Sequence, residues 1–381
     1  MAATDSSAPY ALALSGGGFR ATLFHTGALL RLNELSLLPR FSHICGISGG
    51  AIIAGLLGAR WSRLKFDAAG RATNFAAEIV EPLQRFCRRH VDFFPSIANI
   101  GKMLFGLPST ALQSQYDQQL FHGLSLDDLP APGQGPQLSF IAVNLTTGAE
   151  LYFKREVVEE KRLGRMRLPE LKLATVVAAS SAYPPFLSPV VVYVDPAQWT
   201  AQAGADLHGD ARVARKLVLT DGGVYDALGF GPLWGECSTL LVSNASEVRA
   251  VWKASSFWPR QWSRAMLLAT ASTAAISMRL LREFMPPGVR QQDGRCCLYW
   301  ANGARIDDYG VAGALCHDSA VTRNLGQTRT RLNRFHRAEQ AQLINWGYAQ
   351  CDTALKQWRQ TGDRQAPADK VAAWPMPDYA L

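Results

Sequence analysis

The chain has 381 residues, of which 48% are hydrophobic and 18% are charged, and its formal net charge is +8. This composition is that of a globular protein with a large core, and it excludes disorder over most of the length. The 7 cysteines show no metal-ligand spacing, and the pair Cys296-Cys297 is adjacent, so neither a metal site nor a disulfide framework is predicted. A reducing cytosol is the expected environment.

Signals for targeting and for membrane spans are weak. Residues 1–9 lack a basic region followed by an apolar stretch, so they predict a flexible N-terminus without a secretory signal. The longest uncharged stretch, 265–278, is too short and too rich in small polar residues to cross a bilayer. The positive charge suits anionic lipid headgroups or solubility, and the dispersed arginines argue against a nucleic-acid partner. We therefore expect a cytoplasmic protein, peripheral at the inner face of the membrane.

Strand and helix patterns alternate in the first part of the chain. Residues 11–14 form a short apolar run that predicts a buried strand, and leucines at helical spacing over 23–38 predict the helix that follows. The pattern repeats at 42–59 with a second strand and a second apolar helix. Successive strand-helix units are typical of a parallel sheet covered by helices. We predict a three-layer α/β/α fold with a mainly parallel central sheet.

The segment 61–130 loses this rhythm and is predicted to be a helical insertion. Over 85–105 it mixes basic residues with aromatic and apolar ones, which suits either a lid that recruits the protein to a membrane or an extra helical layer on the core. Strand patterns then return at 137–144, 150–153, 190–194, 216–220 and 239–244.

The strand patterns define the expected domain organisation. Residues 10–245 are predicted to form the main α/β domain. Residues 246–366 predict a helical C-terminal extension packed on the same domain, with long helices over 262–285 and 341–358. Residues 367–381 predict a loose tail.

The candidate nucleophile is Ser48, at the centre of Gly46-Ile47-Ser48-Gly49-Gly50. This pentapeptide has the form G-x-S-x-G between a strand-like and a helix-like run, the context in which the motif presents a serine hydroxyl on a sharp turn. Ser48 also falls at a helix N-terminus, where free backbone N–H groups stabilise negative charge. An ordinary tight turn is the alternative, because glycine and serine are common in turns.

A glycine loop follows the first predicted strand. The backbone N–H groups of Gly16, Gly17 and Gly18 are unobstructed by side chains, which suits an oxyanion hole for a tetrahedral intermediate. The same residues match the dinucleotide fingerprint G-x-G-x-x-[GA] through Ala21, with Glu34 as the ribose-binding acid. Glu34 falls within the helical pattern rather than after a second strand, which disfavours this alternative.

Asp221 begins an Asp-Gly-Gly sequence directly after a strand pattern. Burial raises the pKa of a carboxyl toward the range in which it can act as a general base, whereas none of the 7 histidines has so distinctive a setting. A simple turn is again the alternative. Loops that follow the carboxyl ends of parallel strands gather at one edge of a sheet, so we expect Asp221, Ser48 and the glycine loop to meet.

The three motifs, in this order, resemble the patatin-like phospholipase family. Gly16-Gly17-Gly18-Phe19-Arg20 matches an oxyanion motif G-G-G-x-[RK], the serine motif matches the nucleophile elbow, and Asp221-Gly222-Gly223 matches D-G-[GA]. The stretches 25–29 and 179–186 also look like the family. The resemblance covers about residues 10–245 and so identifies this part as the catalytic domain.

The resemblance implies a lipid acyl hydrolase that cleaves fatty-acyl esters of glycerophospholipids, of the phospholipase A or lysophospholipase type, without metal or cofactor. The serine would form an acyl-enzyme, and the aspartate would take its proton and later activate water. The site residues carried over are Ser48 and Asp221 as the catalytic dyad, Gly16, Gly17 and Gly18 as the oxyanion loop, and Arg20, Gly49 and Gly222 in support.

Two side chains near these motifs have simpler interpretations. An exposed position on a helix face is the simplest for Arg20, although it could also stabilise the loop or attract a phosphate headgroup. Packing is favoured over catalysis for His25.

Other functions stay open on the sequence alone. One is an α/β-hydrolase-type esterase with a triad of Ser48, Asp221 and either His317 or His336. Another is a non-catalytic binding protein of the same fold. A phospholipid or membrane surface is the expected partner, and a homo-oligomer or regulatory partner is open. Lipid turnover and a regulated membrane-degrading effector would both use the same dyad.

Overall fold

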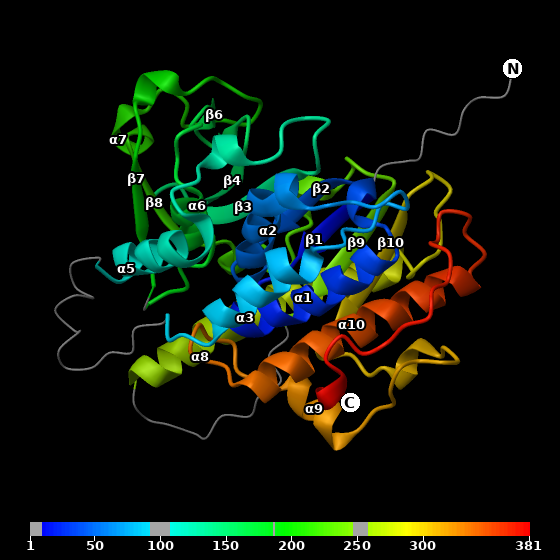
Figure 1. Ribbon diagram of the computed structural model, residues 1–381. Coiled ribbons are helices and arrows are strands. Elements are labelled where there is room, and N and C mark those ends of the chain that lie inside the picture. Colours follow the sequence, from blue (N-terminus) through cyan, green and yellow to red (C-terminus); the bar gives the residue numbers. More distant parts are fainter. Residues whose placement is uncertain (1–9, 92–106, 186, 247–257) are drawn as a thin grey trace, which may run out of the picture.

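The computed structural model describes residues 10–91, 107–185, 187–246 and 258–381. At its centre lies a sheet of 10 strands whose main path is β10-β9-β1-β2-β3-β4-β5-β6 (Figure 1). The five strands from β10 to β3 run parallel to one another, and the remaining pairings are antiparallel. The parallel strands are β1 (Tyr10–Leu14), β2 (Phe41–Gly46), β3 (Gln137–Asn144), β9 (Thr239–Asn244) and β10 (Cys296–Ala301).

The antiparallel part of the sheet extends from β3. On one edge it continues through three strands in order, and on the other edge β8 pairs with the end of β3 and with β7. These strands are β4 (Ala149–Lys154), β5 (Val158–Glu160), β6 (Gly164–Met166), β7 (Val190–Tyr193) and β8 (Lys216–Asp221). The predicted mixed α/β fold with its central, mostly parallel sheet is confirmed.

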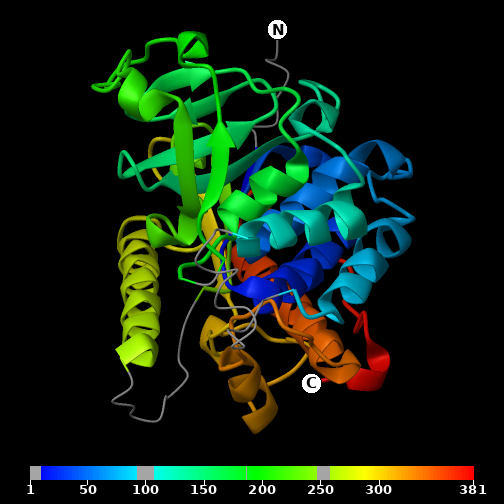
Figure 2. The same cartoon turned by 90° about the vertical axis from the view of Figure 1, so that its left-hand side faces the viewer.

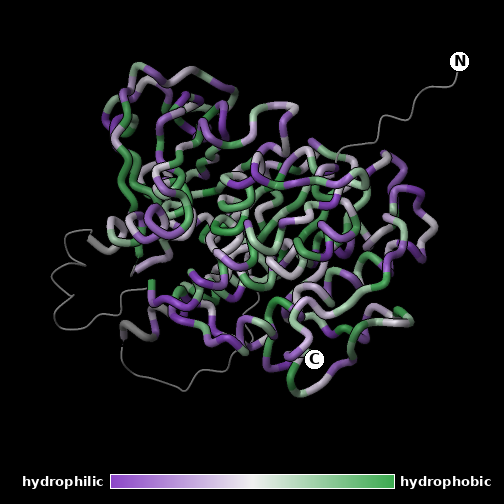
Figure 3. The backbone as a smooth tube through the Cα atoms, viewed as in Figure 1, coloured by the Kyte–Doolittle hydropathy of each residue, from purple (hydrophilic) through white to green (hydrophobic). Residues whose placement is uncertain are grey.

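Helices cover both faces of the parallel strands (Figures 1 and 2). Side chains of β1 alternate between the faces, because Leu12 and Leu14 belong to the main core cluster whereas Ala11 and Ala13 belong to a second, smaller one. The main cluster contains buried residues of the helices α1 (Gly18–Glu34), α2 (Gly49–Arg60), α6 (Leu173–Ser180) and α10 (Arg337–Gln360). In Figure 3 the hydrophobic green is concentrated in the strands and helices at the centre, and purple in the outer loops.

The helices α1 and α10 pack against each other with unusually close backbones. A Cβ added to Gly27 of α1 would lie 1.8 Å from the Ile344 carbonyl oxygen, and one added to Gly347 of α10 would lie 1.8 Å from the Phe24 carbonyl oxygen. Only glycine fits at these two positions. The C-terminal helix is therefore an integral part of the core around the first motif.

The described part of the segment 61–130 packs on the main core as a helical layer. It contains α3 (Glu81–Cys87), α5 (Leu107–Tyr116) and short π-helical turns. Phe86, from the basic-aromatic segment 85–105 for which a membrane lid and a core layer were both open, is buried with its ring centroid 5.3 Å from that of Phe19. Most of this segment, from residue 92 onward, lies outside the described residues, as does the predicted flexible terminus 1–9.

The region after residue 245 differs from the expectation in two respects. Besides the helices α8 (Trp258–Phe284), α9 (Ala320–Gly326) and α10, it supplies the edge strand β10, which pairs with β9. The prediction of a loose tail is wrong, because Asn345 of α10 donates to the carbonyls of Met376 and Tyr379 at 2.9 and 2.8 Å. The Arg31 guanidinium also donates to the Lys370 carbonyl at 2.5 Å.

Not one of the helices that the structure describes is both long enough and apolar enough to cross a bilayer. The remaining short helix, α7 (Ala211–Ala214), lies between β7 and β8.

Candidate active site

Two strands meet end to end along one edge of β3 and bring the serine and the aspartate together. Strand β2 runs parallel to β3 and ends where Gly46 pairs with Phe140. Strand β8 runs antiparallel to β3 and ends where Asp221 pairs with Ala142. The predicted meeting of the two motifs therefore occurs, but the expected reason was incomplete, because β8 arrives from the opposite direction to the parallel strands.

Ser48 lies on a strained turn between β2 and α2. Its φ of 51° and ψ of −118° are a conformation that L-residues rarely adopt, and its side chain caps no N–H group of α2. The turn is held by the Ser48 N–H, which donates to the Ser180 hydroxyl of α6 at 3.1 Å. Gly49 lets the turn contact the glycine loop, since a Cβ there would lie 2.2 Å from the Gly18 carbonyl oxygen. The hydroxyl is thus turned out of the helix and remains 9% exposed.

Asp221 is 2% exposed, and its carboxyl accepts a hydrogen bond from the Gly223 N–H at 2.7 Å. Burial raises the pKa of Asp221 from 3.8 to about 7, and the neighbouring Ser48 hydroxyl and the Gly223 N–H lower it only in part. Gly222 permits this position, because a Cβ there would lie 2.4 Å from the Ile141 carbonyl oxygen. The site therefore joins a presented hydroxyl to a carboxyl that can accept its proton near neutral pH.

The glycine loop lies directly beside the serine. A Cβ on Gly16 would be 3.4 Å from the Ser48 Cβ, but the Gly16 N–H donates to the Ala227 carbonyl at 3.2 Å, so it is engaged within the protein. Gly17 and Gly18 have φ values of 138° and 58°, and among the described residues no hydrogen bond is recorded from either N–H. The N–H groups of Gly17 and Gly18 are therefore the ones that this loop could offer to an anion, whereas the hydrogen bond of Gly16 does not support its inclusion in the predicted donor set.

Arg20 is an anchor of the glycine loop, and its predicted exposure is wrong. The side chain is buried, and its guanidinium donates to the carbonyls of Thr328, at 2.9 Å, and of Ala245. The Ala245 carbonyl also approaches Gly17, where a Cβ would lie 2.6 Å from its oxygen. Arg20 therefore stabilises the loop by connecting it to backbone segments distant in sequence.

The histidines lie outside the hydrogen bonds of Asp221. His25 is buried between the Ser15 carbonyl, 3.0 Å from Nε2, and the Ser243 hydroxyl, 2.7 Å from Nδ1, and burial lowers its pKa to about 4. His317 is exposed and paired with Asp307, and His336 is exposed at the start of α10. These positions agree with packing for His25 and do not form the alternative triad.

The structure does not support the dinucleotide-binding alternative, because Glu34, the expected ribose-binding acid, is bonded within the protein. Glu34 lies at the end of α1, where its carboxylate accepts hydrogen bonds from Arg31, at 3.0 Å, and from Tyr348. The acid is therefore committed to the contact between α1 and α10.

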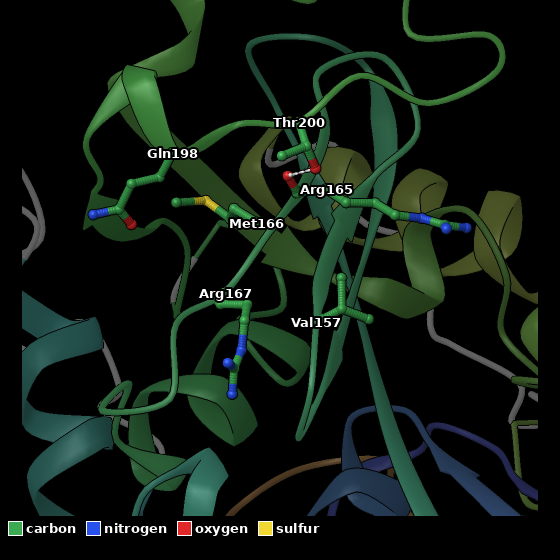
Figure 4. A pocket seen from close by; sticks show the side chains of 6 residues that line it. All are labelled: Val157, Arg165, Met166, Arg167, Gln198 and Thr200. Atoms are coloured by element: carbon green, nitrogen blue, oxygen red, sulfur yellow. Dashed lines mark hydrogen bonds between the residues drawn. The ribbon is translucent and has the colours of Figure 1, made fainter.

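A surface hollow in the described structure lies away from the dyad (Figure 4). It is beside β5 and β6, and its two arginines, Arg165 and Arg167, lie 3.4 and 3.8 Å from the carboxylates of Glu159 and Glu156. Because these charges are paired, the hollow does not present an anion site. No group of residues suited to hold a metal ion occurs in the described ranges.

One residue of the site was missed by the sequence analysis as an individual position. Ser180, which accepts from the Ser48 N–H, belongs to the stretch 179–186 that resembled the family. Its hydroxyl follows an apolar helix and gave no separate signal for contact with a residue so far away in the chain.

The family was tested by comparison with known proteins. The family model described as patatin-like phospholipase matches residues 12–234, more than half of the chain. The chain therefore belongs to the patatin-like phospholipase family, and the prediction made from the ordered motifs is confirmed. A search of curated proteins gives no match.

The chain is also similar to solved structures, and the first of the two described here supports the fold. Human GIVD cytosolic phospholipase A2, solved in complex with methyl gamma-linolenyl fluorophosphonate, is similar with a TM-score of 0.50 and 16% identity, over 94% of this chain and 59% of that chain. VipD from Legionella pneumophila has a TM-score of 0.41 and 14% identity, over 98% of this chain and 73% of that chain. This chain thus spans 59% of the length of the human protein's chain.

Proposed function

We propose that the protein is a serine lipid acyl hydrolase that cleaves fatty-acyl esters of glycerophospholipids. The observation that carries the proposal is the placement of Ser48, on its strained turn, beside the buried Asp221, whose pKa the Ser48 hydroxyl lowers. Membership in the patatin-like phospholipase family supports phospholipids as the substrate class. A lipid-turnover enzyme and a membrane-degrading effector would both use this chemistry.

The geometry supports a two-step reaction. Ser48 Oγ attacks the ester carbonyl carbon while its proton passes to the Asp221 carboxylate. The oxyanion of the tetrahedral intermediate accepts hydrogen bonds from the Gly17 and Gly18 N–H groups, and the alcohol leaves with the proton from Asp221. Asp221 then takes a proton from water, which attacks the acyl-serine ester. When the bond between the acyl carbon and Ser48 Oγ breaks, this proton passes from Asp221 to Oγ, and the fatty acid is released.

The test is release of free fatty acid from mixed phospholipid vesicles by the wild-type protein and by Ser48→Ala. We expect the variant to lose activity on the order of 10⁴-fold or more, because the nucleophile is absent. Labelling by a fluorophosphonate, which should occur in the wild type and not in Ser48→Ala, separates a catalytic serine from a binding protein. Equal release by both proteins would exclude the proposed nucleophile.

A further inference from the structure

Helix α8 is apolar on the face that packs against the protein. Its inward residues follow one another at helical spacing and belong to the second core cluster on the far side of the sheet from α1. They are Ala274, Met278, Leu281 and Met285. This face alone is sufficient to hold the helix on the domain.

The opposite face of α8 is also apolar, and it is exposed. The line formed by residues 258, 262, 265, 269, 272, 276, 280 and 284 contains only aromatic, aliphatic and small uncharged side chains. Trp258 and Phe284, at its two ends, are 72% and 65% exposed, and Trp262, Ile276 and Leu280 are between 45% and 51% exposed. Figure 2 shows α8 at the left edge of the molecule, and the helix runs along the outside over its length. Such a continuous apolar surface is characteristic of an interaction site.

The helix lies beside the active site. The cluster that holds its inner face includes Ile47, the residue before Ser48. Helix α8 also contacts the short turn Gly222–Val224 that follows Asp221. A surface bound by the outer face of α8 would therefore be held close to the dyad.

The charged residues of α8 indicate which kind of surface its outer face would bind. The sequence of α8 contains four arginines, Arg260, Arg264, Arg279 and Arg282, against a single acid, Glu283, in the last turn. Arg279 and Arg282 are exposed in the same half of the helix as Ile276, Leu280 and Phe284. Basic side chains flanking an apolar stripe are typical of helices that lie in the headgroup region of anionic membranes.

We propose that the outer face of α8 is the membrane-binding surface of the protein and that it docks on anionic phospholipid bilayers. The aromatic residues would enter the headgroup and acyl boundary, where indole and phenyl rings partition favourably. Arg279 and Arg282, which are exposed, would contact lipid phosphates. This proposal rests on the proposed function for its meaning, but its binding step requires no hydrolysis.

The first experiment measures binding alone, in a Ser48→Ala background. The probe is sedimentation with vesicles of phosphatidylcholine and phosphatidylglycerol at a ratio of about 7:3, with pure phosphatidylcholine vesicles in parallel. The test variant adds Trp262→Gln and Leu280→Gln on the outer face. The matched control adds Tyr193→Gln and Val321→Gln, which replace exposed apolar residues on β7 and α9.

The expected result separates the two double variants. Removing one aromatic and one aliphatic anchor should weaken binding to the anionic vesicles by about tenfold or more, whereas the control should change it less than twofold. Binding to pure phosphatidylcholine should be roughly tenfold weaker, because the arginines lose their counter-charge. Equal binding by test and control variants, or equal binding to both kinds of vesicle, would overturn the proposal.

The second experiment restores Ser48 and compares two substrates. The Trp262→Gln, Leu280→Gln protein should lose most hydrolysis of vesicle phospholipid while it keeps hydrolysis of a water-soluble short-chain ester, which also shows that it is folded. Failure of the wild type on both substrates would contradict the proposed function but leave the sedimentation result valid. A wild type that forms dimers, which the α8 variant dissociates in light scattering, would overturn the proposal in favour of a second copy as the occupant.

Discussion

The active site and the outer face of α8 depart from the usual distribution of polar and apolar groups in opposite directions. Asp221 places a carboxyl inside the protein, whereas Trp258 and Phe284 place aromatic rings in solvent. Each arrangement costs free energy in the isolated protein, because a buried charge loses its hydration and an exposed ring is not removed from water. Under the two proposals above, both features serve the same substrate, because the buried carboxyl would accept the proton of Ser48 and the exposed rings would enter the lipid surface.

For the active site, the largest loss of activity is expected from Asp221→Asn. Asparagine has similar size and keeps an acceptor for the Gly223 N–H, but it cannot take the proton of Ser48. We expect activity on any ester to fall on the order of 10⁴-fold, measured with vesicle phospholipid and with a soluble ester. A loss smaller than tenfold on the soluble ester would show that another group serves as the base.

The same substitution tests whether burial of Asp221 lowers the stability of the folded protein. Its pKa is raised from 3.8 in the unfolded chain to about 7 in the protein, so the folded state binds the proton more tightly and loses stability as the pH rises through 7. Asp221→Asn should therefore be more stable than the wild type at pH 8, with the difference disappearing at pH 4. Thermal unfolding at both pH values measures this, and a variant less stable than wild type at pH 8 would contradict it.

A smaller effect is expected from Gly17→Ala in the glycine loop. The added Cβ would lie 2.6 Å from the Ala245 carbonyl oxygen, and the φ of +138° is unfavourable for alanine, so the loop must shift. Misplacing one oxyanion donor should lower kcat on the order of 10²-fold. The matched control is Gly204→Ala, at a φ of +84° with nothing within 4 Å, which should keep full activity. Equal losses in both would indicate a general effect of glycine replacement.

The change of the acylation rate with pH is expected to be smaller than the effect of Gly17→Ala. Asp221 acts as a base only when it is deprotonated, so kcat/KM for a soluble ester should rise with pH and level off above its pKa of about 7. At pH 6 the value should be about tenfold below the plateau. A flat profile between pH 5 and pH 8 would show that Asp221 is not the titrating base.

The smallest effects should come from the histidines, which belong to neither region. His317→Ala should leave activity unchanged, because the imidazole is exposed and paired with Asp307. His25→Gln should lower stability more than activity, since the ring fills a buried position between Ser15 and Ser243. Separate assays of kcat and thermal unfolding distinguish the two effects, and a 10⁴-fold loss of activity in His317→Ala would restore the triad.

The sequence was sufficient for the parts of the fold with local signals. The strand-helix units around Gly16–Gly18 and Ser48 have turn glycines, apolar runs and helical spacing close together in the chain, and they predicted both the parallel sheet and the family. Asp221 was recognised in the same way. Its direction of approach was not, because the pairing of β8 with β3 depends on contacts between distant segments and leaves no local pattern.

Other features required the three-dimensional structure for the same reason. The burial of Arg20 depends on the carbonyls of Thr328 and Ala245, and the order of the tail depends on Asn345. The long apolar stretch of α8 was evident in the sequence, but its periodicity could not reveal which of two apolar faces would be buried. An arginine or a tryptophan is only assigned to the interior or the surface once its partners are known.

The position of Thr328 and Arg331 against the glycine loop has a consequence for the order of synthesis. Arg331 accepts a hydrogen bond from the Phe19 N–H at 3.0 Å, and Thr328 holds Arg20, so the first motif is completed by residues made more than 300 positions later. A nascent chain that already contains Ser48 and Asp221 still lacks these contacts. The glycine loop would therefore be completed only after the segment that contains Thr328 and Arg331 has left the ribosome, so the first motif cannot be fully assembled when Ser48 and Asp221 have just been made.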